Sequence, residues 1–182
     1  MPQPENAERI DTVFHGRVIT VNVEHIKLPD GRIGRYEIVH HPGGAAVVAI
    51  DAANQVCLLH QFRPAGGGWI WELPAGRLEP GEPPATTAHR ELIEEAGRRA
   101  DRLESLGTIL SSPGVFAETI HLFLARELTE TPIAHEQHEL IEVHWVPLAE
   151  AVRQALAGEL QDAKTIVGLV RAVSQLQGNP ET

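Results

Sequence analysis

A short acidic helix constrains this chain more than any other feature of its sequence. Two prolines precede residues 85–96 and suit the first turn of a helix, and Gly97 suits the position just past its end. Glu91 and Glu95 are four residues apart and therefore share one face. Like charges at this spacing destabilise a helix by roughly 0.2–0.5 kcal/mol, and the helix dipole disfavours anions near its C-terminal end by about 0.3–1 kcal/mol. Helix stability alone would favour lysine or arginine there.

Two interpretations of this acidic cluster are open. The first is a solvated surface, with Arg90 paired to Glu94 one turn later. The second is a set of hard oxygen ligands of the kind that Mg²⁺ or Mn²⁺ prefers. A loop rich in glycine and proline, carrying Glu82, precedes the helix and favours the second interpretation.

The charge balance points in the same direction. The formal net charge is −10, which argues against general nucleic-acid binding, since that function needs a basic face. An acidic protein that handles an anionic substrate needs positive charge, and bound divalent cations can supply it.

Strands dominate the rest of the chain. Residues 13–26 and 32–40 are predicted to form a hairpin around the turn Pro29-Asp30-Gly31. Residues 41–44 break the pattern, so we divide the chain into an N-terminal β extension, residues 1–42, and a main domain, residues 43–178. The main domain is predicted to contain strands at 45–50, 56–63, 69–73, 103–110, 119–128 and 141–146, and helices at 85–96, 148–157 and 162–176. Residues 76–84 are expected to be irregular, and the fold class is α/β (α+β).

The sequence also suggests a compartment. No run of about 18 apolar residues is present, and residues 1–9 lack the apolar stretch of a secretory signal. Cys57 is the only cysteine, so no disulfide can form within the chain. These features together favour the cytoplasm.

Residues 76–98 carry a recognisable motif. They contain Gly76, then five residues, Glu82, seven residues, and Arg90-Glu91-Leu92-Ile93-Glu94-Glu95-Ala96-Gly97-Arg98. This segment resembles the Nudix box, G-x5-E-x7-R-E-U-x-E-E-x-G-U, where U is apolar. Every fixed position matches, and the one departure is Arg98 at an apolar position. The resemblance implies a Nudix fold, with mixed β-sheets sandwiched between α-helices and the N-terminal β-hairpin as an extension.

The resemblance also implies metal ligands. In the family, two glutamates on the shared helix face hold the metals, and here these are Glu91 and Glu95. The cofactor implied is Mg²⁺ or Mn²⁺, with two or more ions per site. Hydrolysis of a pyrophosphate requires charge neutralisation and a hydroxide-like nucleophile, and closely spaced metal ions can provide both.

Neighbouring box positions have supporting roles in the family. Glu82 supports the metal site directly or through water, and Ala75 offers its backbone carbonyl to a metal. Glu94 belongs to the same acidic cluster and is a catalytic candidate. Arg90 is a structural residue that orients the glutamates.

Flanking segments resemble the ADP-ribose pyrophosphatase branch of the family. The segment 72–76 matches its E-L-P-A-G lead-in, and Gln61-Phe62-Arg63 resembles its Q-Y-R strand. Further matches are Ser112-Pro113-Gly114 followed by Glu118, the segment 139–143, and Asp162-Ala163-Lys164-Thr165. The likeness covers about residues 16–176.

Five residues are candidates for substrate binding. Arg63 is the strongest, because arginine grips phosphate through two parallel hydrogen bonds. Arg35 is a further candidate, and Glu118, which is also a catalytic candidate, is expected to contact the sugar end or metal-bound water. Gly76 and Pro113 complete the set through their places in the matched motifs.

A general base is expected in the polar loop, residues 129–139. Glu139 and Glu136 are the two candidates, and the spacing before Trp145 favours Glu139. The pair His135 and His138 is a poor zinc signal, because no further nitrogen or sulfur ligands cluster with it.

The remaining singled-out side chains have mainly structural interpretations. Cys57 lies in an apolar strand and is expected to be a buried packing residue. Trp69, Trp71 and Phe14 are interpreted as core or interface residues, of which one, with Phe14 as a guess, could stack on adenine.

The resemblance therefore predicts hydrolysis of ADP-ribose to AMP and ribose 5-phosphate. The alternative is pyrophosphatase activity on another nucleoside diphosphate sugar, such as GDP-mannose. A prenyl diphosphate isomerase would need a well-placed cysteine, which Cys57 is not, and a non-catalytic sensor fits poorly with intact carboxylates. Relatives in the branch exchange the N-terminal segment between subunits, so a homodimer is expected.

Overall fold

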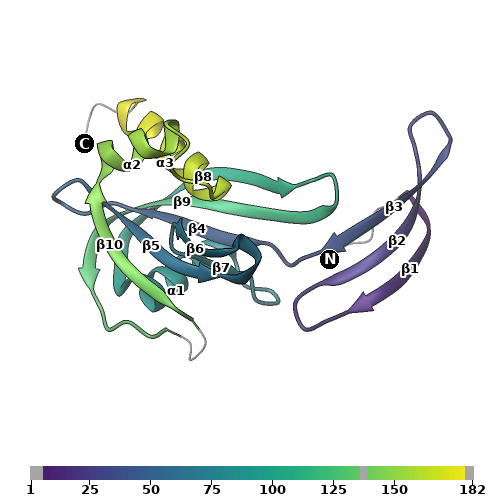
Figure 1. The fold of residues 1–182 in the computed structure, drawn as a ribbon, viewed down its shortest axis with the longest axis horizontal. Helices are drawn as coiled ribbons and strands as arrows, with labels where there is room; N and C mark the ends of the chain where they lie inside the picture. The colour runs from purple at the N-terminus through teal and green to yellow at the C-terminus, as the bar shows by residue number, and fades with distance from the viewer. Residues whose placement is uncertain (1–5, 136–138, 179–182) are drawn as a thin grey trace. The chain divides into compact units, whose positions relative to one another are not determined.

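The computed structural model describes residues 6–135 and 139–178. By its internal contacts the chain divides into two compact units, coloured along the chain in Figure 1. The first unit comprises Met1–Gly43 with Leu110–Thr119, and the second comprises Gly44–Ile109 with Ile120–Thr182. The change of unit after Gly43 falls within the break predicted at residues 41–44, but the first unit also includes residues 110–119.

The first unit contains an antiparallel meander of three strands, the third of which also pairs in parallel with Phe116 and Ala117 of the same unit. β1 (Ala7–His15) pairs with β2 (Thr20–Lys27), and β2 pairs with β3 (Ile33–His40). The single strand predicted for residues 13–26 is therefore wrong, because the chain reverses at Gly16, whose N–H donates to the Ile19 carbonyl at 2.9 Å. β1 was missed because its side chains are mostly exposed, so it has no apolar stripe. The extension thus has one strand more than the expected hairpin.

A mixed sheet forms one layer of the second unit. β4 (Gly44–Ala49) pairs in parallel with β9 (Phe116–Glu130) from Ile120 to Ala125, and antiparallel with the short β7 (Ala75–Arg77). β8 (Arg98–Ser112) pairs with β9. The irregular stretch predicted at residues 76–84 was thus partly wrong, because its beginning is β7.

A second, three-stranded sheet has the order β10-β5-β6 and is antiparallel throughout. It consists of β5 (Gln55–Arg63), β6 (Gly68–Glu72) and β10 (Ile141–Pro147), with the short 3₁₀ turn η1 (Pro64–Gly66) between β5 and β6.

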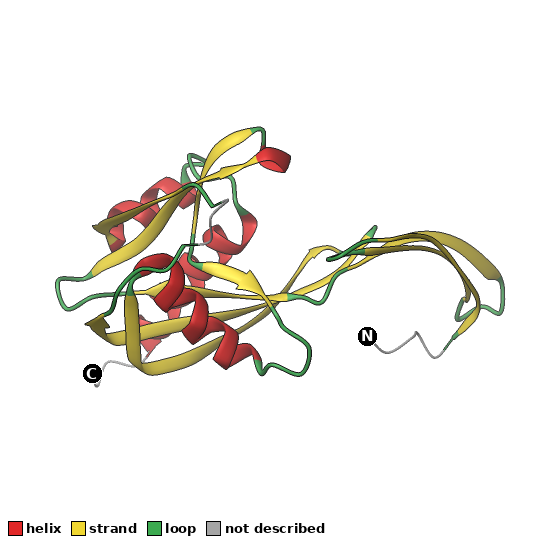
Figure 2. Cartoon of the chain, turned by 90° about the horizontal axis from the view of Figure 1, so that it is seen from below, coloured by secondary structure: helices red, strands yellow, loops and turns green. Residues whose placement is uncertain are grey.

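Helices lie against these strands, as Figure 2 shows. They are α1 (Pro84–Ala96), α2 (Leu148–Leu156) and α3 (Ala163–Gly178). Gly97 has φ 60° and its N–H donates to the Ile93 carbonyl, which confirms the predicted end of the first helix. None of the helices in the described part of the chain is long and apolar enough to span a membrane.

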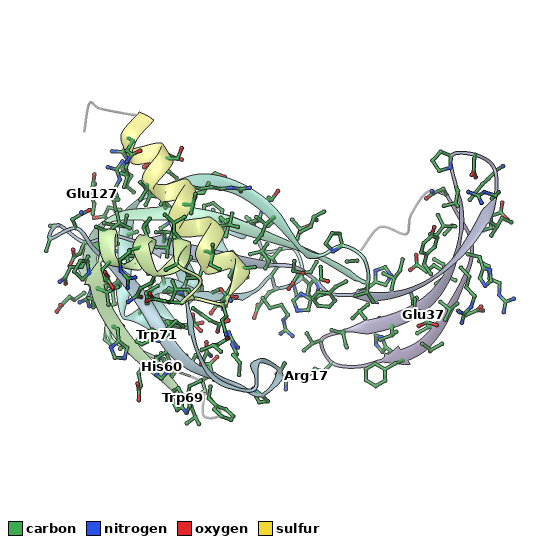
Figure 3. All side chains as sticks on the ribbon, turned by 45° about the horizontal axis from the view of Figure 1, so that its top comes forward. Arg17, Glu37, His60, Trp69, Trp71 and Glu127 are labelled. Atoms are coloured by element: carbon green, nitrogen blue, oxygen red, sulfur yellow. The ribbon has the colours of Figure 1, made fainter. Side chains whose placement is uncertain are left out.

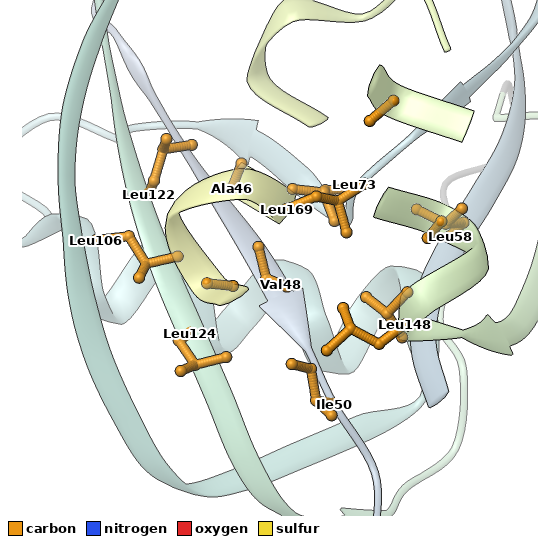
Figure 4. Packing of buried hydrophobic residues seen from close by; sticks show 14 of the residues in the cluster. Ala46, Val48, Ile50, Leu58, Leu73, Leu106, Leu122, Leu124, Leu148 and Leu169 are labelled. Atoms are coloured by element: carbon orange, nitrogen blue, oxygen red, sulfur yellow. The ribbon is translucent and has the colours of Figure 1, made fainter. Parts of the chain in front are cut away.

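Two hydrophobic cores lie on opposite faces of β4. Its side chains alternate, so Ala46 and Val48 join the first core with α2 and α3, shown in Figure 4. Ala45, Val47 and Ala49 join the second core with α1. All six residues of β4 are buried, and the strand is therefore the centre of a helix–sheet–helix arrangement. This arrangement confirms the predicted fold class.

Candidate active site

The second core buries the acidic face of α1. Ala88, Leu92 and Ala96 have almost no exposed surface and fix the helix against the sheet. Glu91 and Glu95 emerge from the same side and remain only 9% and 3% exposed. The solvated-face interpretation of this cluster is therefore wrong for these two carboxylates.

The strand β7 is shaped around both carboxylates. The Ala75 N–H donates to Glu95 Oε2 at 2.8 Å. A Cβ atom on Gly76 would overlap Glu91 Oε1 and would lie 2.6 Å from Glu91 Oε2. Since the φ of Gly76 is not in the left-handed range, glycine is required here for space and not for backbone conformation.

The Arg90 guanidinium donates hydrogen bonds to three glutamates of the cluster, Glu82, Glu91 and Glu94. Its Nη1 donates to Glu91 Oε1 at 2.6 Å and to Glu94 Oε2 at 3.1 Å, while Nε donates to Glu82 Oε1 at 3.2 Å. The hydrogen bond from Arg90, followed by that from Thr87, lowers the pKa of Glu82 to about 2. One guanidinium thus holds three carboxylates in place, as expected of an orienting residue.

The electrostatics of the site show which groups lie near the buried pair. Burial is the main cause that raises the pKa of Glu91, and Arg90 opposes it. Burial likewise raises the pKa of Glu95 to about 8, with the Ala75 N–H opposing and the charges of Glu91 and Glu139 contributing to the rise. Arg63 acts in the opposite direction on Glu95. The charges of Arg63 and Glu139 therefore both act on Glu95.

A buried ion-pair network lies behind Arg63. Its Nε donates to Glu72 Oε2 at 2.7 Å, and Lys164 Nζ donates to Glu72 Oε1 at 2.6 Å. Lys164 also donates to Asp162 Oδ1 at 3.0 Å. Glu72 and Lys164 were not among the predicted site residues, although both lie in the flanking motifs. The hydrogen bond between Lys164 and Glu72 joins residues that are 92 positions apart, so no local sequence pattern could predict it.

Three other candidates belong to the first unit. Arg35 lies on β3 with Nη1 3.2 Å from Glu37 Oε1. Glu118 Oε1 is 3.0 Å from His41 Nδ1, and Pro113 lies in the turn between β8 and β9.

The polar loop is only partly described. Glu136 and His138 lie outside the described residues. His135 Nε2 is 2.9 Å from the Glu95 carbonyl oxygen, a hydrogen bond that occupies this nitrogen.

Of the residues interpreted as structural, Cys57 is buried as predicted, whereas Trp69 and Phe14 are exposed and are not core residues. Trp69 and Trp71 lie with their ring centroids 5.0 and 4.6 Å from that of His60, a group labelled in Figure 3. Cys57 is fully buried in the second core, and burial raises its pKa to about 12. Phe14 is exposed on β1 in the first unit.

Arg98, the departure from the motif, is accommodated by packing. Its guanidinium lies 5.2 Å from the ring centroid of Trp145, and Nη2 is 3.0 Å from Glu130 Oε1. A cation–π contact thus replaces the apolar contact that the motif calls for.

The carboxylate oxygens of Glu91 and Glu95 fit a hard divalent cation whose remaining ligands are water and substrate oxygens. In the described ranges, no three Asp, Glu, His or Cys side chains converge on one metal position. Yet Glu91 and Glu95 are buried like charges in a cradle that a Cβ atom would fill. Mg²⁺ is typically held by one or two carboxylates, with waters and substrate phosphates completing the shell. The Ala75 carbonyl, on β7, stays a predicted further ligand.

Comparison with known proteins agrees with this chemistry. The family model of the NUDIX domain matches residues 40–167. A Bacillus subtilis (strain 168) ADP-ribose pyrophosphatase is 40% identical over 157 residues, which cover 85% of each chain. A Mycobacterium tuberculosis ADP-ribose pyrophosphatase is 36% identical over 163 residues, which cover 88% of this chain and 79% of that protein. A crystal structure of an ADP compounds hydrolase has the same fold, with a TM-score of 0.82 at 21% identity, covering 99% of this chain and 98% of that one.

Proposed function

The chain belongs to the NUDIX family, and on that premise we propose that it hydrolyses the diphosphate of ADP-ribose to AMP and ribose 5-phosphate. The observation that carries the proposal is the buried pair Glu91 and Glu95, with Arg63 and Glu139 within electrostatic reach. Both relatives described above are ADP-ribose pyrophosphatases, which supports this substrate over GDP-mannose.

The chemistry assigns distinct tasks to these side chains. Glu91, Glu95 and the Ala75 carbonyl would hold Mg²⁺ or Mn²⁺, in two or more ions. When bound, the cation supplies positive charge to the diphosphate. Arg63 donates hydrogen bonds to a phosphate oxygen and orients it.

The reaction itself is the addition of water to a phosphorus atom of the diphosphate. Glu139 accepts a proton from the attacking water, and the bond between that phosphorus and the bridging oxygen breaks. The bridging oxygen leaves with one phosphate and is protonated, so one water is consumed for each AMP and ribose 5-phosphate formed. Glu136 is the rival base.

The remaining assignments rest on the family pattern. Arg90 orients the carboxylates, and Glu82 and Glu94 support them through it. The structure shows the Arg90 contacts, and their catalytic consequence is the proposal. Gly76, Pro113, Glu118 and Arg35 stay sequence-based candidates for substrate binding.

Assembly belongs to the same proposal. Val13, Phe14 and Ile33 of the first unit are large apolar side chains that are more than half exposed, which favours packing on a partner. The homodimer expected from the family resemblance would provide that partner. Cytoplasmic location stays a prediction of the sequence.

The test is a substrate panel with Mg²⁺ or Mn²⁺, in which chromatography separates the products. ADP-ribose should give equal amounts of AMP and ribose 5-phosphate, with a kcat/KM above that for GDP-mannose. A Glu91→Gln preparation controls for contaminating hydrolases. If GDP-mannose is the better substrate, the alternative holds; if no nucleotide sugar is cleaved, the substrate class is wrong.

Two other functions are disfavoured by the structure. An isomerase that uses a cysteine as an acid or base would need an accessible thiol, but Cys57 is buried and its pKa is raised to about 12. A ligand sensor needs no hydrolytic centre, whereas the four box glutamates are intact here. Turnover of ADP-ribose would exclude the sensor directly.

A further inference from the structure

Glu72 is a buried carboxylate shared between two cations. It lies at the end of β6 with 4% of its surface exposed. Arg63 Nε approaches Oε2 at 2.7 Å, and Lys164 Nζ approaches Oε1 at 2.6 Å. Each carboxylate oxygen therefore has its own cation, and Arg63 is held through a single nitrogen.

The two cations differ in what they can reach. The Lys164 side chain is 12% exposed and its ammonium also contacts Asp162 Oδ1, whereas the Arg63 side chain is 40% exposed. Arg63 is also the cation that acts on Glu95. Of the two, the more exposed Arg63 can meet a substrate phosphate, whereas Lys164 is more deeply buried.

The start of α3 holds Lys164 in position. Asp162 Oδ2 accepts hydrogen bonds from the Thr165 N–H at 3.0 Å and from the Thr165 hydroxyl at 2.6 Å. The same hydroxyl oxygen accepts a hydrogen bond from the Leu73 N–H at 2.9 Å. The segment 162–165 is thus fastened to the end of β6, next to the carboxylate that Lys164 contacts.

We propose that Lys164 is a positioning residue that keeps Arg63 available for the substrate diphosphate. A carboxylate with both oxygens accessible pairs with a guanidinium through two parallel hydrogen bonds, the geometry preferred by arginine. Lys164 occupies Oε1 and so prevents this pairing. Without Lys164, Arg63 turns a second nitrogen toward Glu72 and loses a donor that would otherwise bind phosphate. This inference rests on the proposed function and adds a residue that does not touch the substrate.

The experiment uses the full-length protein with ADP-ribose and Mg²⁺. Lys164→Met removes the charge while keeping a long side chain, and it should raise KM about tenfold, the value of one hydrogen bond to a charged group, with kcat within about threefold. Lys164→Arg should stay near wild type. Arg153→Met is the matched control, because it removes a cation from an exposed pair with Glu150 on α2 and should change neither constant.

A double-mutant cycle separates positioning from direct contact. Arg63→Met should raise KM, and adding Lys164→Met to it should cause no further rise, because the arginine to be positioned is gone. Full additivity would show that Lys164 contacts the substrate itself and would overturn the proposal. An unchanged KM in Lys164→Met would overturn it as well.

A second variant keeps the proposal testable if Lys164→Met folds poorly. Glu72→Gln combined with Lys164→Met removes both charges, so no unpaired carboxylate is buried and Arg63 is no longer drawn into a charged pair. KM should then return toward the wild-type value, and continued elevation would contradict the mechanism. Thermal unfolding establishes that each variant is folded.

Failure of the proposed function would be visible separately. If the wild-type protein does not cleave ADP-ribose, that function is wrong whatever Lys164 does. Positioning of Arg63 is then measured by calorimetry with inorganic pyrophosphate and Mg²⁺. Weaker binding to Lys164→Met than to wild type supports the positioning role, and equal binding refutes it.

Discussion

Gly76→Ala should strongly reduce activity without removing any charged group. The added Cβ atom would overlap Glu91 Oε1 and lie 2.6 Å from Oε2, whereas real Cβ atoms essentially never approach closer than 3.0 Å. Oε2 must therefore retreat by at least 0.4 Å, the difference between these distances, and Oε1 must retreat further. Alanine itself fits the backbone, because the φ of Gly76 is outside the left-handed range.

The displacement is large enough to matter for catalysis. Catalytic groups need to be held within about 0.5 Å of their productive positions, and a misplacement of about 1 Å can cost roughly 10²-fold in rate. We therefore expect kcat/KM for ADP-ribose to fall about 100-fold and the Mg²⁺ concentration for half-maximal activity to rise. The clash is with a side chain and not with backbone, so the variant should still fold, and thermal unfolding checks this.

The assay is Mg²⁺-dependent AMP release, with thermal unfolding on the same samples. Gly178→Ala is the matched control, because nothing lies within 4 Å of a Cβ atom there. Glu91→Gln is the complementary variant, since it keeps the side-chain position and removes the charge. If Gly76→Ala retains wild-type turnover and Mg²⁺ dependence, Glu91 is not a ligand that needs this position.

The other predictions concern the second ligand, the base and the assembly. Glu95→Gln should lower kcat by about 10²–10³-fold, the loss expected when transition-state electrostatics are removed. Burial raises the pKa of Glu95 from 4.5 to about 8, so the folded metal-free protein keeps a proton that the unfolded chain releases, and its stability falls as pH rises through that range. Metal-free Glu95→Gln should therefore melt above wild type at pH 8, and the reverse order would contradict this burial effect. Glu139→Gln should lower kcat far more than it changes KM; if Glu136→Gln does so instead, Glu136 is the base. Light scattering should give a homodimer at micromolar concentration, and a fully active monomer would refute that assembly.

The local part of the site could be predicted from the sequence, because its residues repeat at helical spacing. Glu91 and Glu95 needed only the period of one helix, and Gly97 marked the helix end. The short apolar run at residues 45–50 predicted a strand, and the structure shows both of its faces buried. Long-range pairs were not visible in this way, and the link between Lys164 and Glu72 is the clearest example.

The errors in the predicted fold have physical causes. β1 has few buried side chains, so its stability comes from backbone pairing with β2 and leaves little hydrophobic pattern. β7 is three residues long, and its strand conformation is determined by pairing with β4. The choice between Glu136 and Glu139 depends on loop geometry, and periodicity carries no information about it.

The burial of β4 on both faces restricts how this protein can evolve. Ala45 and Ala46 face different cores, and a Cβ atom on Gly168 of α3 would already lie 3.1 Å from Val48 Cγ2. A larger side chain on one face would push against α3, and on the other against the helix that carries Glu91 and Glu95. Sequence drift in β4 is thereby confined to exchanges among small and β-branched residues of nearly equal volume. Adaptation to new substrates is left to the loops around it, where added residues do not disturb either core.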